Sequence, residues 1–329
     1  MSTVVLLHSD ELRALLSVED CIEAVRSGYQ QRGPAKPRTK LVSDAPRGML
    51  TSYLSMLPET GRMGGYIYAA GFEAEDAQFL LPLFDGESGQ LLALLDGASM
   101  NPYKTGAVGA VGVDALARKD VSTLAVIGSG PQARGQVAST ATVRSFDTVR
   151  VYSPTAANRK AFAAEMSDRI GVSVEPVESS ETAVRGADVV ITATNATEPV
   201  FDGEGLEPGT HVTAMGQYDR GVREIDTTTV ARAKYVTDLE ERATNDAGAF
   251  LQAIEEDAID ESHLHGDLGA VLSGAVDGRT SPEEITVFDS GGTGVETVAV
   301  ASMLYDRAQE EGLGTEIEIS AASDALDGR

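Results

Sequence analysis

The chain has 329 residues, with 51 acidic and 26 basic side chains, so its formal net charge at neutral pH is −25. A chain this acidic has no electrostatic attraction for the phosphates of nucleic acid or for an anionic membrane surface, which argues against partners of either kind. With 42% hydrophobic and 23% charged residues, it has the composition of a folded globular protein, and its length predicts one large or two medium domains.

The composition also predicts where the protein works. Only six of the 26 bases are lysine and tryptophan is absent. This composition favours a halophilic protein, because concentrated salt screens the repulsion of an acidic surface; an ordinary acidic protein is the alternative. We expect a cytoplasmic protein, since there is no signal-peptide pattern and no apolar stretch of the ~18 residues that a membrane span needs. The single cysteine, Cys21, excludes an internal disulfide and a cysteine-rich metal site.

A first helix is predicted to follow Ser17, a residue type that caps helix N-termini, with Asp20 three residues later in a capping-box-like position. The apolar side chains Ile22, Val25 and Tyr29 come next at helical spacing, and a Gly-Pro pair then stops the helix.

A hairpin is predicted farther along the chain. Two apolar runs, residues 79–84 and 90–95, flank the turn sequence Asp-Gly-Glu-Ser-Gly, so this part of the sheet is expected to be antiparallel. A new helix is predicted to start at Asn101 and Pro102, because asparagine is a strong N-cap and proline is tolerated at the first helical position. Three glycines at a spacing of three indicate that another backbone approaches this helix closely: Gly106, Gly109 and Gly112.

From residue 122 onward, short apolar runs alternate with helical stretches, the pattern typical of a parallel, doubly wound sheet. The change of pattern near residue 120 predicts a domain division. Helices are expected from about residues 132 and 156, with a final long helix near residues 295–309. The strands are expected at residues 124–127, 148–152, 189–192, 211–215 and 234–237.

Residues 122–133 have the pattern of a strand that enters a G-x-G-x-x-A turn and then a helix. In such a turn Gly128 permits the tight bend, Gly130 lets a pyrophosphate approach the backbone, and Ala133 keeps helix and strand close. The exposed N–H groups and the positive helix end then hold the phosphates. The pattern predicts a dinucleotide-binding Rossmann domain, with a purely structural glycine turn as the alternative.

The residues after the next strand bear on the choice of dinucleotide. An NAD site usually has Asp or Glu there to bind the ribose 2′-hydroxyl. Here Ser153 and Thr155 take its place, and Arg159 and Lys160 follow. Hydroxyl and basic groups favour a 2′-phosphate, so we predict NADP. NAD remains the alternative if the two bases only form a solvated helix face.

Five segments resemble, in order and spacing, motifs of the ornithine cyclodeaminase/mu-crystallin family. The resemblance implies an α/β fold: a doubly wound Rossmann domain over residues 119–294, plus a smaller α/β substrate and dimerisation domain over residues 1–118 with 295–329. It further implies a homodimer with its active site in the cleft between the domains. The segments are residues 101–107, 127–134, 208–212, 223–226 and 286–290.

The resemblance carries over to individual positions only in part. Arg38 matches the arginine that binds a substrate carboxylate, a task that suits a guanidinium fork. Lys104 stands where most members have arginine, near the cofactor phosphates and the substrate. The family's substrate lysine falls on Ile67, and its catalytic aspartate on Tyr218, or on Asp219 if the alignment shifts by one residue. We therefore predict Lys104, Tyr218 and Asp219 as catalytic, and Arg38, Lys104 and Gly291 as substrate-binding. Cofactor-binding residues are expected at Thr105, Gly128, Gly130, Pro131, Gln132, Ser153, Thr155, Arg159, Thr194, Met215 and Ser290.

The resemblance implies chemistry at an imine carbon. The predicted function is an NAD(P)-dependent oxidoreductase that reduces a small 2-imino acid or reductively aminates a 2-oxo acid, as an imine or ketimine reductase or an alanine dehydrogenase does. Two alternatives stay open: a cyclodeaminase-like lyase that uses tightly held NAD, and a non-catalytic NADP-binding protein like mu-crystallin. His263 and His265 are close enough in sequence to ligate a metal, but no third ligand follows at a suitable spacing, so no metal is expected.

Overall fold

The structure is a computed structural model that describes residues 2–73, 76–320 and 322. The chain forms two compact units, residues 1–104 with 293–329 and residues 105–292. The second unit is thus inserted into the first. The boundaries, however, lie after Lys104 and after Gly292, earlier than the expected 118 and 294.

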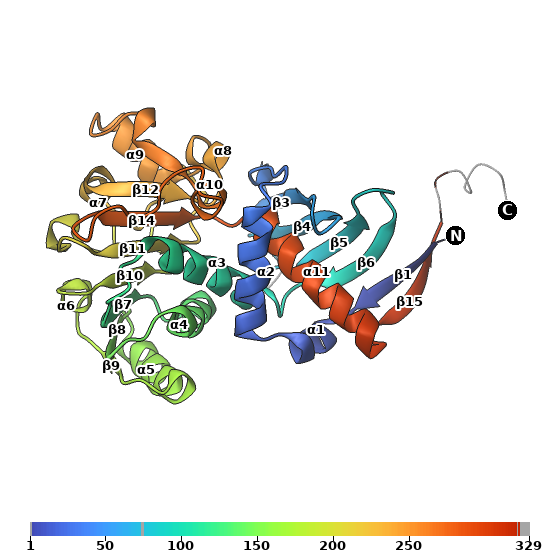
Figure 1. Cartoon of the computed structure of the whole chain (residues 1–329), viewed down its shortest axis with the longest axis horizontal. Coiled ribbons are helices and arrows are strands. Elements are labelled where there is room, and N and C mark those ends of the chain that lie inside the picture. The colour runs from blue at the N-terminus through green and yellow to red at the C-terminus, as the bar shows by residue number, and fades with distance from the viewer. Residues whose placement is uncertain (1, 74–75, 321, 323–329) are drawn as a thin grey trace. The chain divides into compact units, whose positions relative to one another are not determined.

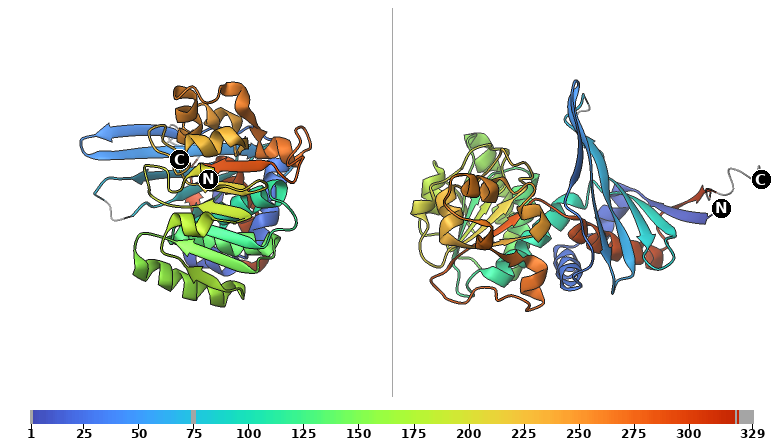
Figure 2. Two further views of the ribbon diagram at one scale, coloured as in Figure 1. Left: turned by 90° about the vertical axis from the view of Figure 1, so that its left-hand side faces the viewer. Right: turned by 90° about the horizontal axis from the view of Figure 1, so that it is seen from above.

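Within the described residues, the first unit contains a seven-stranded sheet with the order β15-β1-β6-β5-β4-β3-β2, in which only β1 and β6 are parallel neighbours. Helix α11 packs against α2 and lies on β3 and β4 (Figure 1). The β2–β3 hairpin extends beyond the rest of the sheet (Figure 2). The strands are β1 (Ser2–Leu7), β2 (Thr39–Asp44), β3 (Arg47–Leu57), β4 (Arg62–Ala70), β5 (Leu80–Asp85), β6 (Leu91–Asp96) and β15 (Thr315–Ile319); the helices are α1 (Ser9–Leu15), α2 (Val18–Gln30) and α11 (Gly294–Glu311).

The predicted cap of α2 is confirmed, because Ser17 accepts a hydrogen bond from the backbone N–H of Asp20 at 3.1 Å. The helix ends at Gln30, before the Gly33-Pro34 pair that was expected to stop it. The strands β5 and β6 form the expected antiparallel hairpin.

The two faces of this sheet differ in burial, because side chains alternate along each strand. On the inner face, Tyr53 of β3 and Tyr66 and Tyr68 of β4 are buried. On the outer face, large apolar side chains keep 41 to 68% of their surface exposed. They are brought together by the pairing of β2 to β5: Leu41, Leu50, Leu54, Ile67 and Leu80.

The second unit contains an eight-stranded parallel sheet with the order β13-β12-β14-β11-β10-β7-β8-β9. Counted from β7, its first five strands have the order 3-2-1-4-5, which confirms the doubly wound fold. The strands are β7 (Thr123–Ile127), β8 (Thr148–Tyr152), β9 (Val174–Pro176), β10 (Val189–Thr192), β11 (His211–Met215), β12 (Ala233–Thr237), β13 (Leu264–Asp267) and β14 (Ile285–Ser290). The helices are α4 (Pro131–Val143), α5 (Ala156–Ile170), α6 (Ser180–Val184), α7 (Thr227–Arg232), α8 (Glu240–Ala243), α9 (Gly248–Glu255) and α10 (Leu268–Leu272), with short 3-10 helices at Gly203–Gly205 and Glu261–His263.

Hydrophobic cores cover both faces of this sheet. Along β7, Leu124 and Val126 pack into the core that includes α4 and α5, while Ala125 and Ile127 pack into the core that includes α6, α7 and α9. Side chains of a strand that alternate between two covered faces are typical of a parallel sheet.

The helix α3 (Asn101–Leu116) explains why the first boundary lies earlier than expected. A Cβ added at its three glycines would lie 2.4 Å from the Gly135 carbonyl oxygen, 1.9 Å from the Gln136 side chain and 2.4 Å from the Phe288 ring. All three neighbours belong to the second unit, and these contacts draw most of α3 into that unit. The predicted approach of another backbone is found only at Gly106, because Gly109 and Gly112 face side chains. No helix within the described residues combines the length and hydropathy needed to cross a membrane.

Candidate functional site

The second unit has a cavity of about 370 Å³ at the carboxyl ends of β7, β8 and β10. The strands β8 and β10 lie on either side of β7, so the chain leaves this edge in opposite directions, and doubly wound folds bind their ligands at such a switch point. The turns after these strands and after β11 line the cavity with Gly128, Ser129, Gly130, Pro131, Gln132, Ser153, Pro154, Thr155, Asn158, Ala193, Thr194, Asn195, Met215 and Gly216.

The glycine turn has the geometry that a pyrophosphate requires. Gly128 has φ 121°, and a Cβ there would lie 2.2 Å from the carbonyl oxygen of Ala193. A Cβ at Gly130 would meet no atom within 4 Å, so the backbone at this position is open to a ligand. Gly130 is also the N-cap of α4, where no side chain caps the helix and no acidic residue occupies the first turn. The free N–H groups and the positive helix end therefore fit an anion.

Polar groups farther along the cavity fit the rest of a dinucleotide. The Oε1 atom of Gln132 is buried and has no hydrogen-bond partner among the described residues, so a donor on a ligand would satisfy it. At the expected ribose position, Ser153 accepts a hydrogen bond from Ser129 Oγ at 3.0 Å. Thr155 and Asn158 lie beside it in the lining.

Arg159 lies behind the residues that line the cavity and is not one of them. Its guanidinium donates to the carbonyl oxygen of Ser153 at 3.1 Å and is ion-paired with Glu178. The side chain is almost fully buried, so its hydrogen bonds brace the turn that carries Ser153.

A buried carboxylate from the segment 223–226 fixes another part of the lining. Glu224 Oε1 accepts hydrogen bonds from the backbone N–H of Thr194 at 2.6 Å and from its Oγ1 at 2.5 Å, while Oε2 accepts one from Thr192 Oγ1 at 3.0 Å. Burial raises the pKa of Glu224 to about 7, although the hydrogen bonds oppose the rise. This carboxylate therefore holds the turn after β10 in place.

The end of β14 and the residue that follows it lie next to the same cavity. Ser290 pairs with Met215 in the sheet, and its carbonyl oxygen accepts a hydrogen bond from the N–H of Gly216 at 2.8 Å. Gly291 is buried beside the backbone of Gln217. Neither Ser290 nor Gly291 lines the cavity directly. Ser290 supports Gly216, which does line it, and Gly291 packs against Gln217, the next residue in the loop.

The first unit gathers two cations on the inner face of its sheet. The guanidinium carbon of Arg38 lies 4.5 Å from the ring centroid of Tyr53, and the guanidinium donates a hydrogen bond to the hydroxyl of Tyr68. The Lys104 ammonium lies 5.6 Å from the centroid of Tyr53 and 5.4 Å from that of Tyr66. Aromatic faces stabilise cations at these distances, so the three tyrosines orient both side chains.

Lys104 is anchored by a carboxylate of α11. Its Nζ lies 3.6 Å from Glu296 Oε1, and the two side chains are 2% and 0% exposed. Glu296 also accepts hydrogen bonds from the backbone N–H of Thr293 at 2.6 Å and from the Tyr29 hydroxyl at 2.9 Å. Burial lowers the pKa of Lys104 in spite of the nearby carboxylate, because the charged ammonium loses its hydration.

Two of the residues predicted to be catalytic, Tyr218 and Asp219, lie in the loop after β11. Tyr218 is half-buried, whereas Asp219 is exposed and accepts a hydrogen bond from the N–H of Gly221 at 2.9 Å. His263 and His265 each contact a backbone carbonyl oxygen, and the described residues contain no group of three or more side chains arranged to hold a metal ion.

The structure brings most of the predicted cofactor residues together. Eight line the cavity: Gly128, Gly130, Pro131, Gln132, Ser153, Thr155, Thr194 and Met215. Thr105, Arg159 and Ser290 do not, although the Thr105 carbonyl oxygen accepts a hydrogen bond from Gln136 and so helps to hold α3 to α4.

The sequence patterns did not single out the residues that hold Arg38 and Lys104, which are Tyr53, Tyr66, Tyr68 and Glu296. Ile67, the position aligned with the family lysine, points to the outer face of the sheet, whereas its neighbours Tyr66 and Tyr68 point to the inner face. Alternation along β4 would have separated these positions, but only the packing of α11 shows which set faces inward. Tyr53 and Glu296 carry no such signal, because tyrosine in a strand and glutamate in a helix are common.

Comparisons with known proteins agree with this architecture. The model of the ornithine cyclodeaminase/mu-crystallin family matches residues 5–312. A Δ(1)-pyrroline-2-carboxylate reductase of Bacillus cereus is 37% identical over 240 residues, which cover 73% of this chain and 74% of that protein.

Two solved structures are similar over nearly the whole chain. The Thermococcus litoralis Δ(1)-pyrroline-2-carboxylate reductase in complex with NADH and L-proline has 31% identity and a TM-score of 0.90, covering 95% of this chain and 100% of that chain. An archaeal alanine dehydrogenase dimer with bound NAD has 29% identity and a TM-score of 0.90, covering 97% of this chain and 100% of that chain.

Proposed function

The chain belongs to the ornithine cyclodeaminase/mu-crystallin family, and on that premise we propose that it is an NAD(P)H-dependent oxidoreductase that reduces a small 2-imino acid. The favoured substrate is a cyclic imine with a carboxylate on the imine carbon. The observation that carries the substrate class is the similarity to two Δ(1)-pyrroline-2-carboxylate reductases, one of them solved with NADH and L-proline.

The residues of the second unit fit a dinucleotide. The turn at Gly128 and Gly130 and the uncapped start of α4 would hold the pyrophosphate, while Gln132 Oε1 offers a hydrogen-bond acceptor elsewhere in the lining. We place NADPH ahead of NADH, because Ser153 leaves no carboxylate at the ribose position to repel a 2′-phosphate. Titration of the chain with NADPH and with NADH tests this order, and a lower dissociation constant for NADH would reverse it.

In the first unit, Arg38 is the residue that would bind the substrate carboxylate. Its guanidinium rests on Tyr53 and is turned by the Tyr68 hydroxyl, so little rotational freedom is lost when a planar carboxylate binds the fork. Lys104 adds positive charge to the same cluster. Since Glu296 holds its ammonium, Lys104 acts on an anionic ligand at short range as a fixed charge.

The reduction needs a hydride and a proton. The nicotinamide supplies the hydride when it is bound. As the imine carbon gains the hydride, the electron pair of the carbon–nitrogen double bond moves to nitrogen, which takes one proton and becomes an amine. We assign the proton to the Tyr218 hydroxyl, with the Asp219 carboxyl as the alternative, because both lie in the loop that follows the cavity-lining residues Met215 and Gly216.

Two variants separate these donors. Tyr218→Phe removes the hydroxyl and keeps the ring, and we expect its turnover to fall about 100-fold, within the usual range for general acid catalysis. Asp219→Asn should then keep most of the turnover. The reverse pattern would move the role to Asp219, and two fully active variants would exclude both residues.

A substrate screen tests the main proposal. We would measure NADPH and NADH oxidation with five- and six-membered cyclic 2-imino acids, with 2-oxo acids plus ammonia, and with 2-oxo acids plus methylamine. Oxidation with the cyclic imines supports the proposal. Oxidation only with 2-oxo acids plus ammonia would favour the second candidate, an alanine dehydrogenase-like activity, which the similarity to the archaeal enzyme supports. Ammonia release from an amino acid without net cofactor turnover would indicate a lyase, and cofactor binding alone a non-catalytic binding protein.

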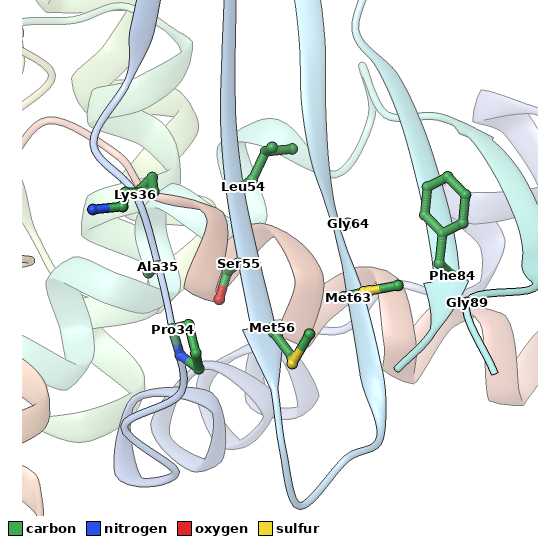
Figure 3. A pocket seen from close by; sticks show the side chains of 10 residues that line it. All are labelled: Pro34, Ala35, Lys36, Leu54, Ser55, Met56, Met63, Gly64, Phe84 and Gly89. Atoms are coloured by element: carbon green, nitrogen blue, oxygen red, sulfur yellow. The ribbon is translucent and has the colours of Figure 1, made fainter. Parts of the chain in front are cut away.

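We also assign the outer face of the sheet to a homodimer. Its exposed apolar side chains continue into a cavity of about 480 Å³, where Leu54, Met56, Met63 and Phe84 come together (Figure 3). An apolar surface of this kind is costly to leave in water, and the archaeal relative is described as a dimer. A second copy of the chain is therefore the occupant that we propose for this face.

The net charge of −25 bears on the conditions of these assays. We propose that the chain is salt-adapted, so activity and thermal stability should both rise between low salt and molar potassium chloride. Chloride and sulfate salts of equal ionic strength separate simple screening from other salt effects. Unchanged stability across this range would remove the salt adaptation.

A further inference from the structure

We propose that Asp238, held by Arg242, is a positioning residue that keeps residues 290–292 in place against the wall of the dinucleotide cavity. The inference rests on the proposed function for what the cavity binds. We call Asp238, Arg242 and the segment that they hold, residues 290–292, the clamp. All of these residues belong to the second unit.

Asp238 makes three contacts with successive residues through one carboxylate oxygen. Its Oδ2 accepts hydrogen bonds from Ser290 Oγ at 2.9 Å, from the N–H of Gly291 at 2.9 Å and from the N–H of Gly292 at 3.0 Å. The residue is only 1% exposed, so water does not replace these bonds easily. Bonds from charged acceptors to backbone N–H groups are among the stronger hydrogen bonds in proteins.

Arg242 fixes the direction in which this carboxylate points. Its Nε donates to the other oxygen, Asp238 Oδ1, at 2.6 Å, and its Nη2 donates to the carbonyl oxygen of Asp289 at 2.7 Å. Burial alone would lower the pKa of Arg242, but the surrounding carboxylates raise it well above its usual value, so the guanidinium stays charged. With both oxygens engaged, the Asp238 carboxylate is held in a single orientation.

The clamped segment touches the cavity wall. The Ser290 carbonyl oxygen accepts a hydrogen bond from the N–H of Gly216, which lines the cavity. A Cβ added at Gly291 would lie 2.9 Å from the carbonyl oxygen of Gln217 and 3.0 Å from Arg242 Cδ, so the backbone fits closely between the arginine and the loop that carries Tyr218. A shift of residues 290–292 would therefore move the wall and that loop together.

The other explanation is that this cluster only stabilises the fold. Asp246 allows the two to be separated, because its Oδ1 lies 3.6 Å from Nη1 of the same arginine. Asp246→Asn removes a carboxylate from Arg242 and leaves the Asp238 acceptor in place. Asp238→Asn removes a carboxylate from Arg242 and also leaves the loop donors without a full set of acceptors, since an amide has one oxygen and one donor group.

The test compares the wild-type chain with Asp238→Asn and Asp246→Asn. Hydrogen–deuterium exchange of the peptide that spans residues 290–292 is measured without ligand, followed by equilibrium titration with NADPH and by steady-state kinetics with a cyclic imine. In Asp238→Asn we expect local exchange to be about tenfold faster and NADPH affinity to be about tenfold weaker, the cost of losing buried hydrogen bonds. In Asp246→Asn both quantities should stay within about twofold of wild type, even if the melting temperature falls equally in both variants.

Equal loss of melting temperature with unchanged exchange and affinity in Asp238→Asn would overturn the clamp. If Asp238→Asn does not fold, Gly291→Ala replaces it, because its methyl group would push the segment away from Arg242 without changing any charge. Unchanged exchange and affinity in that variant would also overturn the clamp. A wild-type chain that binds NADPH but reduces no imine would refute only the proposed substrate. A wild-type chain that binds neither NADPH nor NADH would refute the proposed function, and the exchange measurement would still decide whether Asp238 holds residues 290–292.

Discussion

Replacing Lys104 by methionine tests the buried ion pair at the start of α3. The substitution keeps most of the length of the side chain and removes its charge, so Glu296 becomes a buried carboxylate without its cation. At the observed 3.6 Å, two unit charges attract by about 5 kcal/mol at an effective dielectric constant of 20. Glu296 would keep its bonds to Thr293 and Tyr29, so we expect the net loss in the free energy of unfolding to be near the lower end of the usual range, about 3 kcal/mol.

The double variant Lys104→Met, Glu296→Gln separates stability from function. Neutralising both partners removes the unpaired charge, so the denaturation midpoint in guanidinium chloride should return most of the way to the wild-type value. Turnover with a cyclic imine should not return, because the fixed positive charge proposed to act on the ligand is still missing. A single variant within about 0.5 kcal/mol of wild type would refute the reasoning about the pair. A double variant with restored turnover would show that Lys104 has only a structural role.

Three further predictions follow from other parts of the chain. Ser153→Asp should weaken NADPH binding about tenfold or more while NADH binding stays level or improves, because a carboxylate repels a 2′-phosphate and accepts a hydrogen bond from a 2′-hydroxyl. Equal NADPH titration curves for the wild-type chain and this variant would argue against the assigned ribose position. The folded-state pKa of Glu224 is about 7, above its ordinary value of 4.5, so between these two pH values the folded chain binds a proton that the unfolded chain has lost. The contribution of Glu224 to the free energy of unfolding therefore falls as the pH rises from 4.5 to 7. Between these pH values the unfolding free energy of the wild-type chain should fall by about 3 kcal/mol more than that of Glu224→Gln, which has no carboxyl group to titrate. Parallel pH profiles of the unfolding free energy for the two chains would contradict the raised pKa. Ile67→Lys places a charge on the outer face, so light scattering should give the mass of a 34.5 kDa monomer instead of that of a dimer. The control Glu310→Lys, at an exposed position on α11, should leave the mass unchanged. A dimer in both variants would exclude this face as the interface.

The fold of the second unit was predictable because its local patterns and its long-range packing agree. The runs at residues 148–152, 189–192 and 211–215 coincide with strands β8, β10 and β11. The runs of β10 and β11 are buried along their whole length, as parallel strands covered on both faces are, whereas β8 alternates between buried and half-buried residues. The boundary between the units was less predictable, because α3 is one continuous helix and only its glycine contacts show to which unit most of it belongs.

The site was predictable where backbone conformation dictates residue type. Gly128 and Gly130 stand out in the sequence because the turn needs a positive φ at one position and an open backbone at the other. The tyrosines around Arg38 were not predictable, since their role depends on which face of the sheet α11 covers. Asp238 and Arg242 were missed for a related reason: one lies 52 residues from Ser290 in the sequence, and no spacing rule links the two.

Among the buried carboxylates, Asp238 and Glu296 have similar tasks at the second point where the chain passes between its units. The second unit ends at Gly292, and Asp238 binds the three residues before that boundary. The first unit resumes at Thr293, and Glu296 binds both Thr293 and Lys104, the last residue before the first passage. A chain with net charge −25 gains nothing in solubility from burying an acid, and each buried carboxylate costs several kcal/mol of hydration. Their positions are better explained by what they hold: each uses a charged acceptor to fix backbone N–H groups next to residues to which we assign the ligands.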